Sequence, residues 1–578
     1  MRSTRDGGLW FGLGRADITA CVAGMSMWGW GSTHNVPVGA AAPLHARAIV
    51  LAEDCAATAP IVFVTVELGM VSEALRTAAL EALQRRGIDV DAHRFTITAT
   101  HTHSGPSGFS TYLFYQAAGP GFSQPLVDRL ATGVVAAVCA ALESLAPGRV
   151  HSHAEDLPLI EPVCFNRSLA AYNRNLDVAP VAADRGDEAV SRRMTVLRFE
   201  DAFGRARGLL AIFGVHGTSI HADNNLLHPD NPGIAASECE RAAARDGCRD
   251  FVCLFVQAAA GDVSPNYRWS AQRGLFVGRY DDDFEAAAAC GEAQAKHALR
   301  LLAAASTLGT ELAGPLVAEL HTVRFDQTEV DADLVRAGEC SSTSVARLGV
   351  SFCLGTREGP GPLGSAPTLV AALGGACSLL SRDRDLAHDP KPVLWDLGPG
   401  GDKRIAGRFE SSHPLLALWD DRRMRFYRAA LAEPGALTRP WVPHTLPFQI
   451  LRIGSFAAAL VPFEPTTVAG RRIRSTVADA LAATGVRHVE VLGYANAYAS
   501  YLTTPEEYDE QAYEGAATLF GRASLPAVCS RLRAVARGIA AQHLNDDTRL
   551  LTIAPGPEGS AAFATAVVSN DLDARCTG

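Results

Sequence analysis

The sequence lacks several features that would place a protein in a class at once. Its 578 residues contain no apolar stretch approaching the roughly 18–20 residues of a membrane span, and no run of lysine and arginine. The formal net charge of −10 argues against general nucleic-acid binding, which needs a basic surface. The thirteen cysteines are scattered and never spaced Cys-x-x-Cys, so we expect reduced thiols rather than a disulfide scaffold or a zinc knuckle.

The first residues lack the apolar segment of a secretory signal, which predicts a cytoplasmic protein unless a leader has been removed. We find no internal repeat and no low-complexity linker. With 48% hydrophobic and 20% charged residues, the chain has a globular composition and enough length for two or more structural units. The oligomeric state stays open.

What the sequence does contain is an alternation of strand-like and helix-like segments. Apolar, β-branched runs predict strands at residues 61–67, 94–99, 194–199, 208–215 and 251–256, and a hairpin at 450–461. Residues 72–86, 124–145 and 282–305 predict helices, the second of them stopped by Pro147-Gly148. This pattern is typical of an α/β (mixed α+β) fold with mixed sheets and flanking helices.

We expect one large catalytic unit over residues 1–578, divisible into lobes of about 12–330 and 390–545. The Gly-, Ser- and Pro-rich residues 335–375 predict surface loops between the lobes. Residues 527–544 predict a helix, and 548–568 one or two strands.

The most informative segment is Thr-His-Thr-His-Ser-Gly-Pro at residues 100–106, directly after the strand at 94–99. Alternate residues of a strand share a face, so His101 and His103 point the same way. Two imidazoles at the end of a strand suit a metal site or a catalytic pocket. Taken alone, the pair fits a half-buried strand with two satisfied histidines equally well.

Other strands also end in polar clusters, and these favour a site. His216 follows one strand, Ser264 and Asn266 lie in the cluster after another, and Glu464 and Tyr501 follow two more. In α/β folds the loops at strand ends bind ligands. One such cluster is weak, but four or five together predict a shared site.

These segments resemble the neutral ceramidase family (neutral/alkaline non-lysosomal ceramidases). The resemblance covers roughly residues 12–540 and rests on residues 14–19, 100–106, 166–172, 215–219, 230–231, 261–266, 390–392, 463–472 and 501–515. It implies a mixed α/β catalytic domain with one zinc ion per chain. It places the zinc ligands on His101, His216, Glu464 and Tyr501, and sets further residues around the substrate amide, namely His103, Arg167, Ser264 and Tyr513.

The resemblance implies hydrolysis of an N-acyl lipid or N-acyl amine by zinc-activated water, with ceramide as the family's substrate. Tyr513 and Arg167 are candidates to hold the oxyanion, and His103 to move a proton or bind a substrate hydroxyl. Ser264 either attacks or positions the substrate, and we favour positioning because Gly-Asp-Val-Ser-Pro is not a Gly-x-Ser-x-Gly elbow. Asn266 binds a polar group of the substrate or caps its turn.

Three departures from the family pattern leave the substrate open. Too few residues follow 544 for a separate C-terminal immunoglobulin-like domain, and Asn166-Arg-Ser-Leu replaces the usual Asn-Arg-Ser-Pro. Trp28 and Trp30 stand in a loop where the family has a Met-Gly-Tyr type sequence, and we assign both to substrate binding.

Two alternatives therefore stand beside the hydrolase. The same zinc scaffold could form, exchange or cleave an amide on a small non-sphingolipid molecule, or the chain could bind lipid without catalysis. The remaining candidates are expected to be structural: His151, His153, His221, His228, Arg471 and Arg472.

Overall fold

The computed structural model of the chain describes residues 9–116, 119, 121–158, 163–336, 338–380, 385–398, 404–405, 409–410, 422–432, 435–436 and 438–544. Its largest element is a mixed sheet with the strand order β11-β9-β8-β6-β1-β3-β4-β5, and β15 pairs with β6. In that order the strands are β11 (Val252–Gln257), β9 (Ala206–Phe213), β8 (Arg193–Asp201), β6 (Ala146–Asp156), β1 (Leu9–Asp17), β3 (His45–Ala52), β4 (Ile61–Val66), β5 (Phe95–Ala99) and β15 (Thr310–Glu311).

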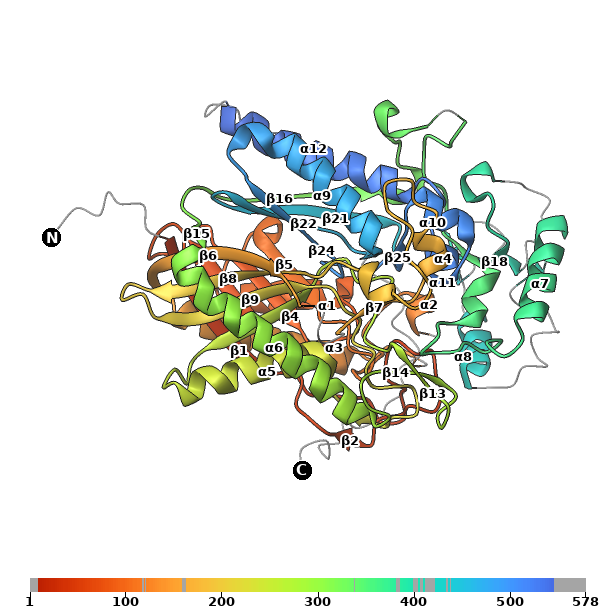
Figure 1. Ribbon diagram of the computed structural model, residues 1–578, viewed down its shortest axis with the longest axis horizontal. Coiled ribbons are helices and arrows are strands. Elements are labelled where there is room, and N and C mark those ends of the chain that lie inside the picture. The colour runs from red at the N-terminus through yellow and green to blue at the C-terminus, as the bar shows by residue number, and fades with distance from the viewer. Residues whose placement is uncertain are drawn as a thin grey trace.

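A second sheet lies against the first and gives the molecule four layers (Figure 1). Its order is β16 (Leu316–Arg324), β21 (Thr445–Ile453), β22 (Phe456–Leu460) and β24 (His488–Leu492). A core of apolar side chains from both sheets, among them Phe63, Leu254 and Phe456, fills the space between them. Because both sheets bury their facing sides, the predicted lobes share one continuous core.

Helices cover the outer faces of the two sheets (Figure 1). The larger sheet carries α1 (Glu73–Arg85), α3 (Gln124–Glu143), α5 (Asp230–Arg245) and α6 (Asp283–Leu308), and the smaller one carries α9 (Thr467–Leu481) and α12 (Ser524–Leu544). α3 packs very closely on β1, because a Cβ on Gly12 would lie 1.8 Å from the carbonyl oxygen of Ala141. The expected α/β class, with mixed sheets and flanking helices, is confirmed.

α3 bears on the expectation that no apolar stretch could cross a membrane. It is long and apolar enough to do so by length and composition, and 56% of its apolar window is buried inside the protein. Its apolar side chains, such as Leu130 and Val134, belong to the core against β1, β3 and α1. The helix therefore fits the description of a core helix.

Two further details differ from the sequence predictions. Pro147-Gly148 does not simply stop α3, because both residues lie within β6, which pairs with β1 and β8. The predicted surface loops at 335–375 contain β17 (Arg347–Gly349), the 3-10 turn at Val350–Leu354 and most of α7 (Pro367–Leu380). The Gly-, Ser- and Pro-rich composition of this segment favours loops, but its packing against the rest of the protein stabilises a strand and helical turns there. The strands expected at 548–568 lie outside the described residues.

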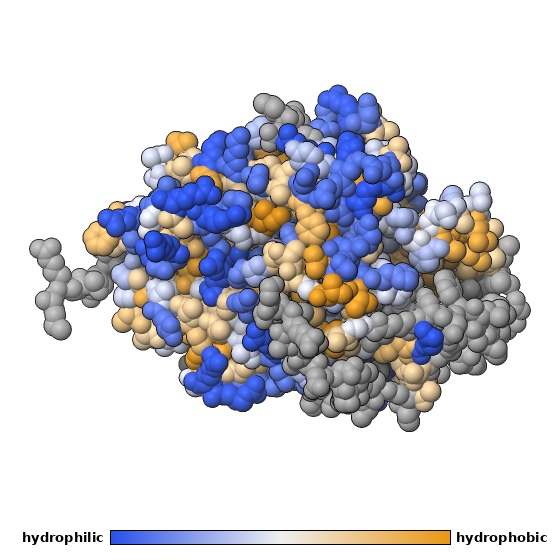
Figure 2. Space-filling model, turned by 90° about the horizontal axis from the view of Figure 1, so that it is seen from below, coloured by the Kyte–Doolittle hydropathy of each residue, from blue (hydrophilic) through white to orange (hydrophobic). Residues whose placement is uncertain are grey.

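The remaining elements are short and surround the strand ends. They are β17 with β18 (Val393–Asp396), β19 (Arg404–Ile405) and β20 (Phe409–Glu410); the pairs β2 (Gly39–Ala40) with β10 (Leu226–Leu227), β7 (Phe165–Asn166) with β12 (Val263–Ser264), β13 (Arg268–Ser270) with β14 (Leu275–Val277), and β23 (Glu464–Pro465) with β25 (Tyr501–Leu502); and the helices α2 (Leu113–Gln116), α4 (Leu169–Tyr172), α8 (Arg422–Leu431), α10 (Pro505–Glu510) and α11 (Tyr513–Ala517). On the face seen in Figure 2, hydrophilic surface alternates with smaller hydrophobic groups, as is usual for globular proteins.

Candidate metal centre and active site

His101 and His216 stand at the ends of β5 and β9 and are almost completely buried. In each ring Nδ1 lies 2.6 Å from a backbone carbonyl oxygen, that of Gly69 for His101 and that of Ala260 for His216. A carbonyl only accepts, so each Nδ1 donates its hydrogen and each Nε2 keeps a free lone pair. This is the tautomer that a metal ligand needs, fixed by the backbone.

Glu464 and Tyr501 reach the same point from the parallel pair β23 and β25, in which they are register partners. Glu464 Oε2 lies 3.4 Å from His101 Nε2 and 3.2 Å from His216 Nε2. The Tyr501 hydroxyl lies 3.3 Å from His216 Nε2. The four predicted ligands therefore converge, although up to 400 positions of sequence separate them.

The donor set fits a bound cation. Two imidazole nitrogens with free lone pairs face one carboxylate oxygen, and a positive ion between them turns this repulsion into coordination. Imidazole nitrogen and carboxylate oxygen are usual ligands of zinc, and a phenol oxygen is a rarer one.

His103 is part of the same buried histidine group and does not stand apart from the centre. His101, His103 and His216 form a buried group whose nitrogens lie within 4.8 Å of one another and could hold a metal ion. His103 Nε2 is 3.2 Å from His101 Nε2. Burial, followed by the other two imidazoles, holds the pKa of His103 well below its ordinary value. His103 therefore lies within ligand distance of the same centre as His101 and His216.

Two tyrosines that the sequence analysis did not assign hold Glu464 in place. The Tyr498 hydroxyl donates a short hydrogen bond to Oε1, and the Tyr494 hydroxyl donates to Oε2 at 3.3 Å. Both follow β24 in one of the polar clusters, which is the only signal they left in the sequence. They fix the orientation of the carboxylate, as outer-shell partners of metal ligands do.

The backbone of the centre is strained. His101, Tyr494, Asn496 and Ser500 all have positive φ, between 55° and 67°, in the left-handed region that side chains other than glycine rarely adopt. Such residues persist where surrounding contacts force them, and they cluster at functional sites. Asn496 shows one of those contacts, because its Oδ1 accepts from the backbone N–H of Ile97 at 3.1 Å.

Arg167 is buried beside the centre, but its donors are largely taken. Nε donates to Glu514 at 2.8 Å, Nη1 to Glu358 at 2.8 Å, and Nη2 to both Tyr501 and the Gly261 carbonyl at 2.9 Å. Burial works against its charge, yet Tyr501 and the two glutamates hold its pKa well above the ordinary value. Arg167 is thus arranged to fix Tyr501 rather than to hold an oxyanion freely.

Tyr513 also lies in this region. Its ring stacks on Phe352 at 5.0 Å and meets the Tyr501 ring edge-on at 5.5 Å. The Arg167 guanidinium lies over it at 5.9 Å. The structure therefore brings the predicted Tyr513 next to the predicted Arg167 and Tyr501.

Ser264 and Asn266 are buried together on and just after β12. Ser264 Oγ accepts from the Asn266 backbone N–H at 2.9 Å. Asn266 Nδ2 donates to the Thr218 carbonyl at 2.7 Å, whereas its Oδ1 has no partner among the described residues. Asn266 therefore both closes its own turn and keeps an acceptor free, which is compatible with either predicted role.

Trp28 and Trp30 wall the histidine cluster. Trp28 meets the rings of His101, His103 and Tyr498 edge-on at 5.3–5.6 Å. Trp30 meets His103 edge-on at 4.9 Å. A Cβ on Gly69 would lie 2.1 Å from the Trp28 ring, so the glycine lets the backbone that holds His101 approach the indole.

The residues expected to be structural have local partners. His153 Nε2 lies 2.8 Å from Glu155, and His221 Nδ1 lies 2.8 Å from Asp283. His228 Nδ1 accepts from a backbone N–H, His151 lies 3.8 Å from Glu200, and Arg471 and Arg472 pair with Asp177. No sequence signal pointed to Glu358 or to the role of Glu514.

The chain thus combines a mixed α/β fold with a buried histidine cluster that could hold a metal ion, an arrangement suited to a metal-dependent hydrolase. The family model described as neutral/alkaline non-lysosomal ceramidase, N-terminal, matches residues 10–403 and 421–530. The chain belongs to this family of amide hydrolases.

Individual relatives and solved structures agree. The chain is 33% identical over 514 residues to the neutral ceramidase of Pseudomonas aeruginosa, covering 88% of this chain and 69% of the relative. It is 30% identical over 540 residues to that of Mycobacterium tuberculosis, covering 91% and 76%. A solved ceramidase complexed with C2 matches with a TM-score of 0.78 and 31% identity, covering 98% of this chain and 80% of that one.

Proposed function

We propose that this chain is a zinc-dependent amidohydrolase that cleaves ceramide into a sphingoid base and a fatty acid. The observation that carries the proposal is the convergence of His101, His216, Glu464 and Tyr501 in a chain whose relatives are named neutral ceramidases. One zinc ion per chain would be held by these four side chains. Bound there, zinc supplies a Lewis acid and lowers the pKa of water to about 7.

The chain's own residues prepare this centre. The carbonyls of Gly69 and Ala260 hold both imidazoles in the ligand tautomer. Arg167 donates to the Tyr501 hydroxyl. Burial and then Glu464 raise the pKa of this phenol well above its ordinary value, and the positive charge of Arg167 opposes that rise. Burial within the tryptophan wall excludes water and strengthens each of these polar interactions.

Ser264 acts in this proposal by positioning. Its oxygen already accepts a hydrogen bond from the Asn266 backbone N–H, which fixes the orientation of the hydroxyl. The His103 ring contacts His101, and the Tyr513 ring contacts Tyr501, so each lies next to a proposed ligand. Because Arg167 is surrounded by acceptors, Tyr513 is the better candidate of the predicted pair to donate to the carbonyl oxygen of the substrate.

The test combines metal analysis with product assays. We expect the purified chain to bind one zinc and to release fatty acid from ceramide, measured by mass spectrometry. The variants H101A and H216A should lose the bound metal and at least about 100-fold of kcat/KM, since each removes one ligand. H151A is the matched control, because His151 belongs to the second His-x-His pair, on β6 away from the centre.

Two results would contradict the proposal. One is full activity in protein from which a chelator has removed all metal. The other is a wild-type protein that binds zinc but hydrolyses no N-acyl sphingoid base. In that case, incubation with free fatty acid and amine would show whether the centre forms amides instead.

A further inference from the structure

The loop at residues 355–361 carries a charged group into the active site. It is a tight turn closed by its own hydrogen bonds, from the Thr356 N–H to the Gly359 carbonyl at 2.9 Å and from the Gly359 N–H to Thr356 Oγ1 at 3.1 Å. A Cβ on Gly359 would lie 2.3 Å from the Trp30 ring, so the turn rests directly on the tryptophan wall. The hydrogen bonds within the turn and its contact with Trp30 therefore both restrict the position of Glu358.

Glu358 has one oxygen engaged and one without a partner. Oε1 accepts from Arg167 Nη1 at 2.8 Å, and the side chain is completely buried. Oε2 is also buried and has no hydrogen-bond partner among the described residues. Burial disfavours the charge, but the Arg167 guanidinium outweighs it and holds the pKa of the carboxyl below its ordinary value.

The charges around Arg167 do not balance. Glu358 and Glu514 both face this one guanidinium, so the group carries one negative charge more than positive charge. Glu514 has both oxygens engaged, because Oε1 accepts from Arg167 and Oε2 accepts from Ser168 Oγ. Only Glu358 therefore offers a free carboxylate oxygen. A buried acceptor of this kind is rare without a donor, and in an active site the donor can come from the substrate.

The position of the donor within the substrate follows from the chemistry of an N-acyl amide. The acyl chain is apolar and has no hydrogen to donate, whereas the amine half of a sphingoid amide carries hydroxyl groups. The Arg167 guanidinium connects Glu358 to Tyr501, because it donates to both side chains. Tyr501 in turn contacts His216 in the candidate metal centre. A hydroxyl near the amide nitrogen can thus reach Glu358 while the amide lies at the centre.

We propose that Glu358 is a specificity-determining residue whose Oε2 accepts a hydrogen bond from a hydroxyl group on the amine half of the substrate. This inference rests on the proposed function, because it assumes that the substrate is an N-acyl amine. It assigns to Glu358 the selection of hydroxylated amines, whereas Glu514 only positions Arg167.

The test compares substrates within each variant. The panel is an N-acyl sphingoid base and analogues with the same acyl chain that lack one hydroxyl of the base. Wild type should favour the hydroxylated substrate by about 10- to 100-fold in kcat/KM over one of the analogues, as for one charge-assisted hydrogen bond. In E358Q, which keeps an oxygen for Arg167 but places an NH2 group at Oε2, that preference should fall to about 1–3-fold.

E514Q is the matched control. It also weakens the hold on Arg167, so it should lower kcat/KM for all substrates by a similar factor and keep the preference. If E358Q behaves in the same way, Glu358 is only a positioning residue and the inference is wrong. Equal turnover of every analogue by wild type would overturn it as well. If E358Q does not fold, E358D, which withdraws the oxygens by one methylene, serves for the same comparison.

A binding measurement separates this inference from the proposed function. Calorimetric titration of the same amides into wild type and E358Q gives dissociation constants without turnover. If wild type hydrolyses none of the panel, the proposed function fails, but a hydroxyl preference in binding that E358Q abolishes would still support the role of Glu358. Equal affinities for all analogues would refute it.

Discussion

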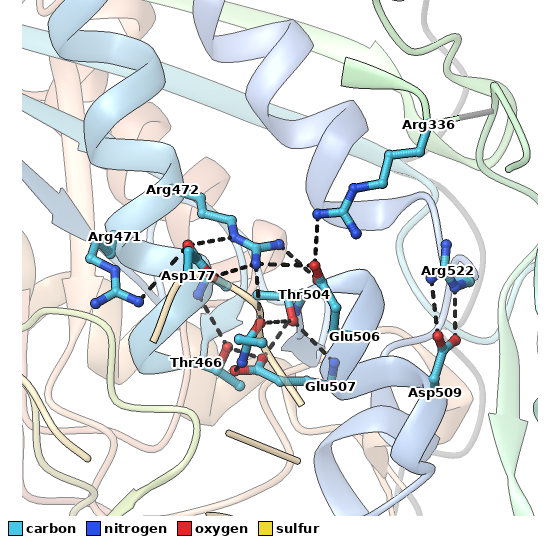
Figure 3. Close-up of polar contacts among 12 residues, drawn as sticks. Asp177, Arg336, Thr466, Arg471, Arg472, Thr504, Glu506, Glu507, Asp509 and Arg522 are labelled. Carbon is cyan, nitrogen blue, oxygen red and sulfur yellow. Dashed lines mark hydrogen bonds and ion pairs between the residues drawn. The ribbon is translucent and has the colours of Figure 1, made fainter. Parts of the chain in front are cut away.

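Replacing Glu506 with glutamine (E506Q) should destabilise the protein at neutral pH and lose its effect in acid. Glu506 lies in α10, just after the strand that carries Tyr501. Arg472 binds it with both Nη atoms, at 2.8 and 3.2 Å, and Arg336 Nη2 adds a third contact at 2.7 Å (Figure 3). Burial opposes the charge, but the hydrogen bonds from Arg472 outweigh it and lower the pKa of Glu506 to about 2.

The magnitude follows from linkage between ionisation and folding. A fall in pKa from 4.5 to about 2 corresponds to about 3.4 kcal/mol at 1.36 kcal/mol per unit. Arg336 is half exposed, so solvent screening reduces the contribution to roughly 2 kcal/mol. Because the folded-state pKa is depressed, the stabilisation is present above about pH 4.5 and is lost as the pH falls toward 2. Roughly 40% of it should remain at pH 3.

The assay is the difference in Tm between wild type and E506Q, measured by calorimetry from pH 7 to pH 3. With about 2.1 cal/mol/K of unfolding entropy per residue, roughly 2 kcal/mol shifts Tm by about 2 °C. The matched control is E510Q on the same helix, where the partner Arg174 is half exposed, and it should shift Tm by less than about 0.5 °C. A Tm difference for E506Q that stayed constant from pH 7 to pH 3 would refute the reasoning.

Three further changes probe the centre and its support. Y501F removes a proposed ligand and one acceptor of Arg167, so zinc affinity in a chelator competition should fall at least about 10-fold; unchanged affinity would remove Tyr501 from the ligand set. G69A drives a methyl group into Trp28 and should cost about 1–3 kcal/mol of stability and weaken zinc binding, which thermal unfolding and the same titration measure; unaltered values would contradict the close packing. R47M removes the buried arginine that pairs with Glu67 and Glu240, and leaves Glu240 with only the partly exposed Arg15. It should cost about 3–5 kcal/mol, seen as a Tm lower by about 3–4 °C. A loss below about 1 kcal/mol, as for an exposed ion pair, would contradict this reasoning.

The sequence predicted the strands and the polar clusters at their ends well, because both are local patterns. His101 and His216 follow β-branched runs that could be recognised without knowing their neighbours. Their assignment as ligands together with Glu464 and Tyr501 came from a resemblance, since no local pattern reports contacts across hundreds of residues. The structure brings all four together, and their role in binding zinc stays a prediction.

The residues that sequence reasoning missed share one property, in that their role depends on tertiary placement. Glu358 lies in a Gly- and Pro-rich segment whose composition is typical of an exposed turn, yet it is buried and pairs with Arg167, and its neighbour Gly359 packs on Trp30. Tyr494 and Tyr498 read as ordinary core aromatics until Glu464 is placed between them. The two glutamate partners of Arg167 could not be recognised in advance either, and its expected oxyanion role stays a prediction.

The left-handed residues around the centre have a consequence for the order of events on heating. Unfavourable positive φ angles persist only while surrounding contacts enforce them, and four residues here have them: His101, Tyr494, Asn496 and Ser500. When those contacts loosen, these segments gain from relaxing earlier than the regular strands beneath them. Activity should therefore be lost at a temperature several degrees below the one at which the sheets unfold. A bound ligand that bridges His101 and Glu464 should bring these two temperatures closer together.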